Sequence, residues 1–379
     1  MAAPFRRRVE RLLAHADVRI DGDRPWDIRV HAPRFYARVL GQGSLGLGEA
    51  YMDGDWDAGS LDGLLLRLLV ARVDERVHGL AAFVDALRAR LANLQAGRRA
   101  FEVGERHYDL GNDLYAAMLG ARMVYSCGYW RSAHDLDEAQ EAKLALCCRK
   151  LGLRPGMRLL DIGCGWGELL RYAAERHGVS GVGVTISREQ AAFARGLCAG
   201  LPVEIRLQDY RSLAQDGGRF DRVVSVGMFE HVGVDNYGTY LDVARGCLAD
   251  EPATGGGLFL LHTIGGECSR RRTDPWIGRY VFPNSMLPSA AQLATALVRR
   301  FVVEDWHNFG ADYDLTLQAW RTNVERAWDR LPARYDEHFR RMWRYYLAGA
   351  MASFRARRNQ VWQLVLSPRG VPGGYAIER

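Results

Sequence analysis

The chain has 379 residues, of which 48% are hydrophobic and 25% charged, a composition that excludes wholesale disorder and collagen-like or low-complexity structure. The net charge is +6, but residues 101–266 carry 17 basic and 21 acidic side chains, so the positive excess lies in the two flanks. Basic residues of a nucleic-acid binder usually concentrate on one element, so we expect no nucleic-acid partner and favour contact with an anionic membrane surface. All basic residues except Lys143 and Lys150 are arginine, which coding bias could explain.

The cysteines and the apolar segments indicate the cellular compartment of the protein. Seven cysteines, an odd number with no C-x-x-C pair, disfavour a disulfide framework and a zinc site, so we predict no metal and a reducing compartment. No apolar segment follows the basic residues 6–8, and the longest apolar run, 64–70, is too short to cross a bilayer. We therefore expect a cytoplasmic protein that at most binds the inner face of the membrane.

The first hundred residues predict a small α+β domain rich in turns. Strand-like pieces at 18–20 and 26–30 precede a glycine-rich run, 41–48, and a turn-rich segment, 51–56, and helical patterns follow from about Leu61 and over 77–94. The glycine-rich run lacks the Lys-Ser/Thr of a phosphate-binding P-loop, so we interpret it as turns. The polar stretch 95–99 is typical of a linker and predicts two domains, residues 1–96 and 97–379.

From residue 157 onward, predicted strands alternate with helices. The strands are 157–162, 179–185, 203–207, 220–226 and 258–262, and the helices are 168–177, 188–199 and 237–248. Such alternation predicts an α/β fold with a parallel, doubly wound, Rossmann-like sheet. From Leu315 to Val365 the pattern is helical, which adds helices at the C-terminal end.

The sharpest motif is a glycine loop after the first of these strands, Leu159-Leu-Asp-Ile-Gly-Cys-Gly-Trp-Gly167. Gly163, Gly165 and Gly167 let the backbone turn tightly and approach a ligand. Their G-x-G-x-G spacing differs from the G-x-G-x-x-G of dinucleotide folds. With Asp161 at the strand end, the loop resembles the first motif of class I S-adenosylmethionine (SAM) methyltransferases, although a tight turn in another α/β protein would give the same pattern.

Two further segments extend the predicted cofactor site. Many such methyltransferases end the second strand with an acidic residue, whereas this chain has Thr185, followed by Gln190. A Thr and a downstream Gln at these places resemble one branch of the fold, the cyclopropane fatty acid and mycolic acid synthases. Gln208 and Asp209 follow the third strand, where the adenine is expected, and Asp209 could accept a hydrogen bond from its exocyclic amine.

Titratable side chains mark a candidate reaction centre. Glu230 and His262 follow neighbouring strands at their carboxyl ends, where open α/β sheets bind ligands. Cys127 and Tyr313 lie in polar-aromatic segments, 123–130 and 306–314. Each has a structural alternative, such as a small buried residue for Cys127 or a packed core histidine for His262. Because the four residues occur in one chain with a SAM loop, we interpret them together as a candidate reaction centre.

A series of longer motifs runs through nearly the whole chain: Trp26-Asp-Ile, Gly43-Ser-Leu-Gly-Leu-Gly-Glu-Ala-Tyr-Met-Asp-Gly54, His107-Tyr-Asp-Leu-Gly-Asn-Asp113, Tyr125-Ser-Cys, Val184-Thr-Ile-Ser, Met228-Phe-Glu-His-Val-Gly233, Leu261-His-Thr-Ile-Gly265 and Phe354-Arg-Ala-Arg357. In this order they resemble the bacterial cyclopropane-fatty-acyl-phospholipid synthases, of the cyclopropane and mycolic acid synthase family of SAM-dependent methyltransferases. The resemblance implies a catalytic domain with the class I SAM methyltransferase fold, a smaller N-terminal domain that engages lipid, and a homodimer.

The resemblance also implies the site residues. A bicarbonate ion serves the family as general base, and the positions that hold it match Cys127, Glu230, His262, Tyr313 and the backbone of Ile264. The SAM contacts of the family match Tyr125, Ser126, Gly163, Gly165, Thr185, Gln190, Gln208 and Asp209.

The implied reaction is transfer of a methylene group from SAM to the cis double bond of an unsaturated phospholipid acyl chain. Attack on the sulfonium methyl leaves a carbocation, which an aromatic pocket that excludes water can stabilise. The candidates for that pocket are Tyr125, Tyr129, Trp130, Phe229 and Tyr280. Plain methyl transfer to an acyl chain or a small amine stays open as an alternative within the fold, and non-catalytic lipid binding as one of another class.

Overall fold

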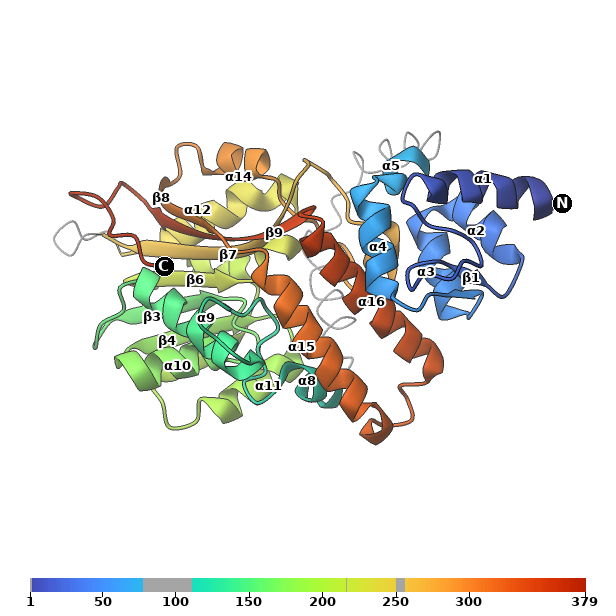
Figure 1. Cartoon of the computed structure of the whole chain (residues 1–379). Coiled ribbons are helices and arrows are strands. Elements are labelled where there is room, and N and C mark those ends of the chain that lie inside the picture. The colour runs from blue at the N-terminus through green and yellow to red at the C-terminus, as the bar shows by residue number, and fades with distance from the viewer. Residues whose placement is uncertain (1, 78–110, 216, 250–255) are drawn as a thin grey trace.

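The computed structural model describes residues 2–77, 111–215, 217–249 and 256–379. A central sheet with helices on both faces forms the larger part, and helices of the N-terminal segment lie beside it, beyond α16 (Glu337–Arg355) (Figure 1). No helix in these ranges has the length and apolarity needed to cross a membrane. The predicted boundary at residues 96 and 97, and nearly all of the helix predicted over 77–94, fall outside the described residues.

The sheet has seven strands in the order β5-β4-β3-β6-β7-β9-β8. The first five pair in parallel and confirm the doubly wound prediction, while β9 pairs antiparallel with both β7 and β8. In chain order the strands are β3 (Arg158–Ile162), β4 (Ser180–Thr185), β5 (Val203–Leu207), β6 (Arg222–Val226), β7 (Leu258–Gly266), β8 (Val302–Asn308) and β9 (Asn359–Ser367).

The strand β9 shows that the prediction of helix from Leu315 to Val365 is wrong at its end. α15 (Asp312–Ala327) and α16 are helical, but the chain from Asn359 onward forms a strand between β7 and β8. The run 361–366 is buried, and a short buried apolar run suits an inner strand as well as a helix. This run forms a strand because it pairs with β7 and β8, both of which are distant from it in sequence.

Helices cover both faces of the sheet and form two apolar cores. α9 (Leu136–Lys150), α10 (Glu168–His177) and α11 (Arg188–Leu197) contribute to one core, and α12 (Tyr237–Cys247) and α14 (Ala290–Leu297) to the other. β3 lies between β4 and β6, where the strand order changes direction, so a ligand crevice is expected at the carboxyl ends of these strands.

The N-terminal segment is a layer of helices with a two-stranded sheet, β1 (Arg29–Val30) paired with β2 (Trp56–Asp57). Its helices are α1 (Ala2–Ala14), α2 (Arg34–Gln42), α3 (Ser44–Met52), α4 (Leu61–Val70) and α5 (Val73–Val77). The glycine-rich run 41–48, which we interpreted as turns, instead spans the end of α2 and the start of α3. A Cβ at Gly46 would overlap the Arg38 carbonyl group, so glycine there lets the two helices pack closely.

The helix α16 joins this layer to the sheet. It packs against α3 and α4, and one continuous apolar core includes Leu64 of α4 and Met351 of α16. An ion pair lies at the same junction, because Arg355 Nη1 is 2.6 Å from Asp62 Oδ2. The N-terminal layer is therefore packed firmly on the part of the chain that contains the seven-stranded sheet.

Candidate active site

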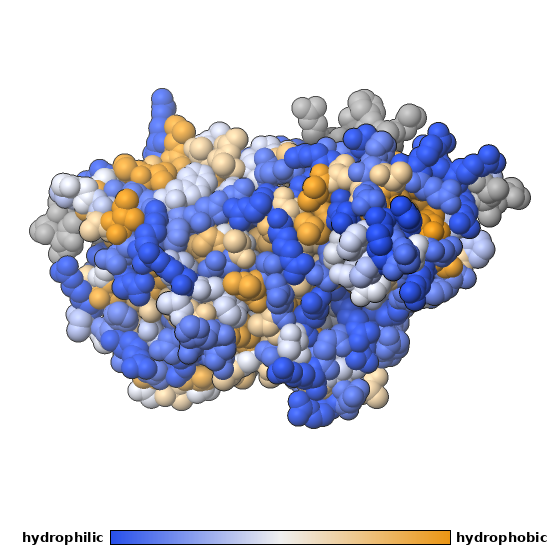
Figure 2. Space-filling view, in the orientation of Figure 1, coloured by the Kyte–Doolittle hydropathy of each residue, from blue (hydrophilic) through white to orange (hydrophobic). Residues whose placement is uncertain are grey.

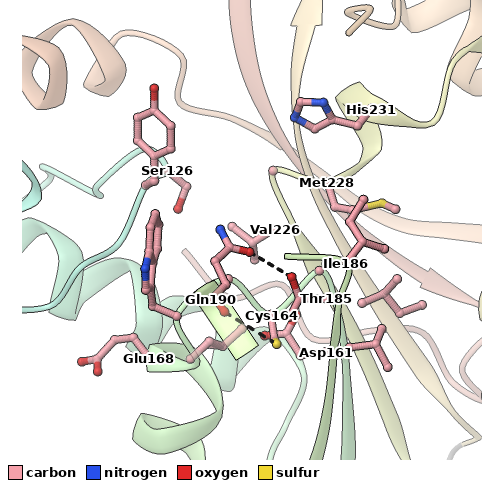
Figure 3. A pocket seen from close by; sticks show the side chains of 18 of the residues that line it. Ser126, Asp161, Cys164, Glu168, Thr185, Ile186, Gln190, Val226, Met228 and His231 are labelled. Atoms are coloured by element: carbon pink, nitrogen blue, oxygen red, sulfur yellow. Dashed lines mark hydrogen bonds between the residues drawn. The ribbon is translucent and has the colours of Figure 1, made fainter. Parts of the chain in front are cut away.

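A cavity opens at the carboxyl ends of β3 and β4, in the crevice that the strand order predicts (Figure 3). Its walls come from residues 123–126, which follow α8 (Asn112–Leu119), from α9, and from the segments after β3, β4, β5 and β6. The residues expected to contact SAM that line it are Tyr125, Ser126, Asp161, Gly163, Gly165, Thr185, Gln190, Gln208 and Asp209. Gly167 does not line the cavity and lies at the start of α10.

The three glycines of the loop have positive φ angles, +89° at Gly163, +53° at Gly165 and +87° at Gly167. A Cβ at Gly163 would lie 2.7 Å from Met228 Cβ, and one at Gly167 would lie 2.9 Å from Ala194 Cβ, so these two glycines allow close packing. A Cβ at Gly165 would meet nothing within 4 Å. Gly165 therefore borders open space in the cavity, where a ligand can approach its backbone.

Hydrogen bonds orient the polar side chains after β4 and β5. Thr185 Oγ1 donates to Gln190 Oε1 at 2.9 Å, a bond visible in Figure 3. Asp209, expected to meet the adenine, pairs with Arg211 Nη1 at 2.8 Å and accepts from the Arg211 backbone N–H at 2.9 Å. A carboxylate has further lone pairs, so this pairing orients Asp209 and leaves room for another donor.

Lys143 is a buried cation at this cavity that the sequence analysis missed. It is 2% exposed, and its Nζ donates to Ser126 Oγ at 3.0 Å. Across the described ranges no carboxylate lies within ion-pair distance of it, and burial lowers its pKa. Nearby Asp161 does not neutralise it fully, since burial raises the pKa of that carboxyl to about 7. A buried cation without an anion is costly, so this amine is suited to bind an anionic group of a ligand.

The signal for Lys143 was present in the composition. Lys143 and Lys150 are the only lysines among 51 basic residues, and both are buried. An ammonium group shifts its pKa when buried far more readily than a guanidinium group does. In an arginine-rich chain, a lysine is therefore a reason to look for a site that needs a compact charge.

A second cavity of about 400 Å³, mostly apolar, lies between the N-terminal layer and the part that contains the seven-stranded sheet. Its walls come from α1 to α5 on one side, and from β7, α13 (Pro275–Tyr280), α15 and α16 on the other. Apolar and aromatic side chains from both sides line it, among them Leu13, Phe35, Leu47, Leu65, Leu69, Trp276, Phe282, Leu317, Tyr345, Tyr346 and Phe354. Ile264 and Tyr313, two predicted reaction-centre residues, belong to the same lining.

Aromatic side chains connect the two cavities. Tyr125 lines the first cavity, and its hydroxyl lies 2.9 Å from that of Tyr346, which lines the second. The Tyr125 ring stacks on Phe282 with centroids 6.3 Å apart, and His231 of the first cavity lies 6.0 Å from the same Phe282 ring. Side chains that line the first cavity are therefore in direct contact with side chains that line the second, and these contacts form the shared wall of the two cavities.

A hydrogen bond connects Glu230 to Ile264, which lines the second cavity. Glu230 lies in a short 3₁₀ turn after β6 and is 6% exposed. Its Oε1 accepts from the Ile264 N–H at 2.6 Å, and within the described part of the chain its Oε2 has no hydrogen-bond partner. Burial raises the pKa of Glu230 to about 7, against the lowering effect of the Ile264 N–H. This carboxyl can therefore hold or release a proton near neutral pH.

His262 and Cys127 are more enclosed. His262 Nδ1 lies 3.3 Å from Nε2 of Gln363, its neighbour across the β7–β9 pair. Burial, with the nearby Lys143 and Lys150 ammonium groups, lowers the pKa of His262 well below its ordinary value, so the ring is neutral. Burial raises the pKa of the Cys127 thiol well above its ordinary value.

The structure brings the predicted reaction-centre residues together only in part. Glu230 is bonded to Ile264, which shares the second cavity with Tyr313. Cys127, Glu230 and His262 line neither cavity, although Cys127 directly follows the lining residue Ser126 in sequence.

The aromatic lining differs from the expected one. Of the five candidates only Tyr125 lines either cavity, while Phe229 stacks on Tyr237 and the Tyr280 hydroxyl donates to Glu49. Tyr129 and Trp130 likewise pack outside both linings. The aromatic residues that line the second cavity are Phe35, Trp276, Phe282, Tyr313, Tyr345, Tyr346 and Phe354. Those on α16 follow helical spacing, a pattern shared with ordinary core faces, so the sequence did not distinguish them.

We predict that Gly165→Asn abolishes SAM binding in a folded protein. Asn tolerates the left-handed backbone at φ +53°, and its side chain enters the open space that the ligand needs. Gly152→Asn is the matched control, because Gly152 has φ +56°, equally open surroundings and no place in the cavity lining. Isothermal titration with SAM measures both proteins. Unchanged affinity in folded Gly165→Asn would refute this placement of the ligand.

We predict that Lys143 donates a charge-assisted hydrogen bond to the carboxylate of bound SAM, so Lys143→Met should weaken SAM binding by about tenfold. Lys150→Met serves as control: Lys150 is also fully buried, but it pairs with Asp305 at 3.1 Å, away from the cavity lining. Equilibrium binding of SAM separates the two variants. Equal affinities in Lys143→Met and the wild type would show that the amine does not face the cofactor.

The chain is similar to enzymes that modify lipids. It is 51% identical over 376 residues to the cyclopropane-fatty-acyl-phospholipid synthase of Escherichia coli K12, a match that covers 98% of this chain and 96% of the relative. It is 34% identical over 369 residues to the tuberculostearic acid methyltransferase UfaA1 of Mycobacterium tuberculosis, covering 90% of this chain and 83% of that protein.

A solved structure shows the same architecture with a ligand bound. The mycolic acid cyclopropane synthase CmaA1, complexed with S-adenosylhomocysteine (SAH) and CTAB, superposes with a TM-score of 0.63 at 31% identity, covering 70% of this chain and 98% of that one. The family described as mycolic acid cyclopropane synthetase matches residues 95–364. The fold is thus that of class I SAM methyltransferases, and the chain belongs to the mycolic acid cyclopropane synthetase family of SAM-dependent enzymes.

Proposed function

We propose that the chain transfers a methylene group from SAM to the cis double bond of unsaturated phospholipid acyl chains. The observation that carries the proposal is the meeting of two cavities at the Tyr125–Tyr346 contact, one with charged and amide groups and the other mostly apolar. A polar cofactor suits the first and an acyl chain the second. The E. coli relative at 51% identity is named for this activity.

In this arrangement the first cavity binds SAM through groups that match its parts. Lys143 and Ser126 bind the carboxylate, and the backbone at Gly165 contacts the aminoacyl portion. Gln190 and Asp209 bind the nucleoside, as the resemblance implies. Tyr125, which lines this cavity and contacts Tyr346 of the second one, would then stand between the bound SAM and the acyl chain.

The second cavity binds the acyl chain and excludes water. Apolar surface removed from water favours entry at about 25 cal/mol per Å². Attack of the double bond on the sulfonium methyl forms a C–C bond, releases SAH and leaves a cation on the chain. Phe282 and Tyr346, which stand at the shared wall, offer π faces to that cation in a site without water.

The cation becomes a cyclopropane when a proton leaves the transferred methyl group and the ring closes. We propose bicarbonate near Glu230 as the base, held with the help of Cys127, His262 and Tyr313; when bound, it supplies a proton acceptor that is a weak carbon nucleophile. The unpartnered Oε2 of Glu230 supports this site, because a carboxyl group with a pKa of about 7 can donate a hydrogen bond to an anion. The Ile264 N–H already donates to Glu230, so these two residues act as a unit.

The protonation states of the enclosed groups suit a neighbouring cation. Cys127 remains a thiol, and a thiol is a much weaker nucleophile than a thiolate, so alkylation is disfavoured. His262 is neutral and therefore adds no positive charge near the cation.

We also propose that the enzyme is a homodimer that works peripherally at the cytoplasmic face of the membrane, with residues 1–96 as its lipid-docking domain. The N-terminal helix α1 supports this role, because it carries Arg6, Arg7, Arg8 and Arg11 beside Phe5, which is 45% exposed. Figure 2 shows apolar side chains among hydrophilic ones over the N-terminal helices. Anionic headgroups attract such basic residues by about 1 kcal/mol each near a membrane surface. The homodimer rests on the family resemblance.

The test of the function is product analysis with the purified protein. SAM and vesicles of a monounsaturated phospholipid should give cyclopropane ring protons by NMR, and removal of dissolved carbonate should slow the reaction. A methyl-branched chain as the product would establish the alternative reaction, and no lipid product despite SAM binding would contradict catalysis on lipids.

A variant of the second cavity sharpens that test. Gly349 of α16 lines the cavity, and a Cβ there would lie 3.9 Å from Leu65 Cδ1, so Gly349→Leu fills acyl space without a clash at Cβ. Leucine also favours the helix. We expect lost lipid turnover with SAM affinity intact. Gly196→Leu, at an open position of α11, should retain turnover.

Glu230→Gln should lose most activity yet stabilise the fold at alkaline pH. An acid whose pKa is higher in the folded than in the unfolded state loses stability as pH rises from its unfolded pKa through its folded one, here from about 4.5 to about 7. At pH 8 the variant should gain on the order of 3 kcal/mol in the free energy of unfolding, and close to nothing at pH 4. Denaturant titrations at the two pH values measure the difference. An equal gain at both would contradict the raised pKa.

A further inference from the structure

One end of the second cavity differs chemically from the apolar rest. After β7 the chain runs through Glu267, Cys268, Arg270, Arg272 and Asp274, all of which line the cavity. Residues 267–272 are exposed, so this end opens to solvent. Ile264, on the same segment, contacts Glu230 at the proposed reaction centre. The six Cα–Cα steps from residue 264 to residue 270 span at most about 20 Å, so the charged opening lies within about that distance of the proposed reaction centre.

The acidic groups at this opening are already engaged. Glu267 pairs with Arg358 at 2.6 Å and with Arg72 at 2.9 Å. Asp74 pairs with the same Arg358 at 3.2 Å. Asp274 Oδ1 accepts the backbone N–H groups at the start of α13, at 2.9 and 3.1 Å.

The guanidinium group of Arg270, in contrast, has no partner among the described residues. It makes no hydrogen bond or ion pair with any residue that the structure describes, and the backbone carbonyl of Arg270 accepts from Gln292. Arg272, two residues on, lines the same opening. With the acidic groups neutralised by other arginines, the opening presents a positive charge suited to an anion.

Two polar atoms deeper in the lining lack partners. Trp276 is 1% exposed, and its Nε1–H has no acceptor among the described residues; Ser44 Oγ is also buried without a partner there. A Cβ at Gly48 would overlap Cδ1 and Nε1 of Trp276, so the N–H edge of the indole lies against α3, one turn beyond Ser44. The Trp276 ring also lies edge-on to Tyr345, at 4.6 Å between centroids. An indole N–H fixed in an otherwise apolar wall needs an acceptor that a ligand can supply.

We propose that this end of the cavity is a specific site for the polar part of a glycerophospholipid. Arg270 and Arg272 bind the phosphodiester oxygens at the opening, and Trp276 Nε1–H and the Ser44 hydroxyl donate to an ester carbonyl at the top of the acyl chain. Anchoring the lipid at both groups sets how deep its double bond reaches. The inference rests on the proposed function, because it takes the acyl chain to occupy the second cavity.

The experiment compares lipids in micelles of an uncharged detergent, which removes bulk attraction to a charged membrane. The substrates are a monounsaturated phosphatidylglycerol and a diacylglycerol with the same acyl chains. Arg270→Ala/Arg272→Ala should raise the KM for the phospholipid by roughly tenfold and leave that for the diacylglycerol unchanged. Arg271→Ala is the matched control, since Arg271 is adjacent and exposed but pairs with Asp235 and does not line the cavity. An unchanged phospholipid KM in the double variant, or an equal rise for both lipids, would overturn the phosphodiester site.

Trp276→Phe tests the ester contact separately, because it keeps an aromatic ring and removes only the donor. It should raise the KM for ester-linked lipids by roughly fivefold and leave that of the ether-linked analogue, which has no carbonyl, unchanged. An equal change for both linkages would overturn the ester contact.

Failure of the proposed function is distinguishable from failure of this site. If the wild type forms no ring from either lipid, the function falls, and binding of a saturated phosphatidylglycerol, which cannot react, still tests the site by isothermal titration. Weaker binding by Arg270→Ala/Arg272→Ala than by Arg271→Ala supports it, and equal binding by the two overturns it.

Discussion

The packing of α16 on α3 and α4 is the contact on which the proposed lipid site depends. The N-terminal helices supply one side of the second cavity and α16 much of the other, so the cavity exists only while these helices stay together. Apolar contact around Leu64 and Met351 supplies the attraction, since burial of apolar surface is the dominant favourable term in packing. Arg355, which pairs with Asp62 of α4 and with Asp314 of α15, ties three helices at one point. Partly buried ion pairs of this kind contribute orientation more than net stability.

The same helix connects the lining of the second cavity to the proposed reaction centre. α16 ends at Arg355, and the chain continues after a short turn into β9, which lies beside β7. Gln363 of β9 faces His262 of β7 in that pairing, and Ile264, two residues further along β7, binds Glu230. Tyr346 at the shared wall and Gln363 behind the reaction centre therefore lie on one continuous segment. A shift of α16 would disturb both places at once.

Burial of titratable groups gives the site its chemistry and lowers the stability of the fold. Glu230 and Asp161 have pKa values raised to about 7, and Lys143 has a lowered one, all with burial as the main cause. Buried polar atoms are normally paired, so atoms left without partners call for an explanation. Glu230 Oε2, Asp161 Oδ1 and Trp276 Nε1 are such atoms, and each lies at or beside one of the two cavities. Ligands that pair with these atoms would recover part of the cost, so SAM and lipid should each stabilise the folded protein.

The sequence by itself determined the parts of the protein that depend on local patterns. The five parallel strands follow from alternating apolar segments, and the glycine loop with Asp161 predicts the turn that borders the cofactor cavity. Glu230 and His262 could be singled out because strand ends meet at one edge of a parallel sheet.

The tertiary structure alone decided what depends on contacts between distant segments. The run 361–366 became a strand because β7 and β8 pair with it. Gly46 is helical where α2 and α3 pack closely, while Gly43, at φ +57°, separates the two helices. The second cavity arose between helices that are distant in sequence, such as α1 and α16. Helical aromatic spacing looks the same on a core face as on a ligand cavity, so only the packing of the partner helices could distinguish the two.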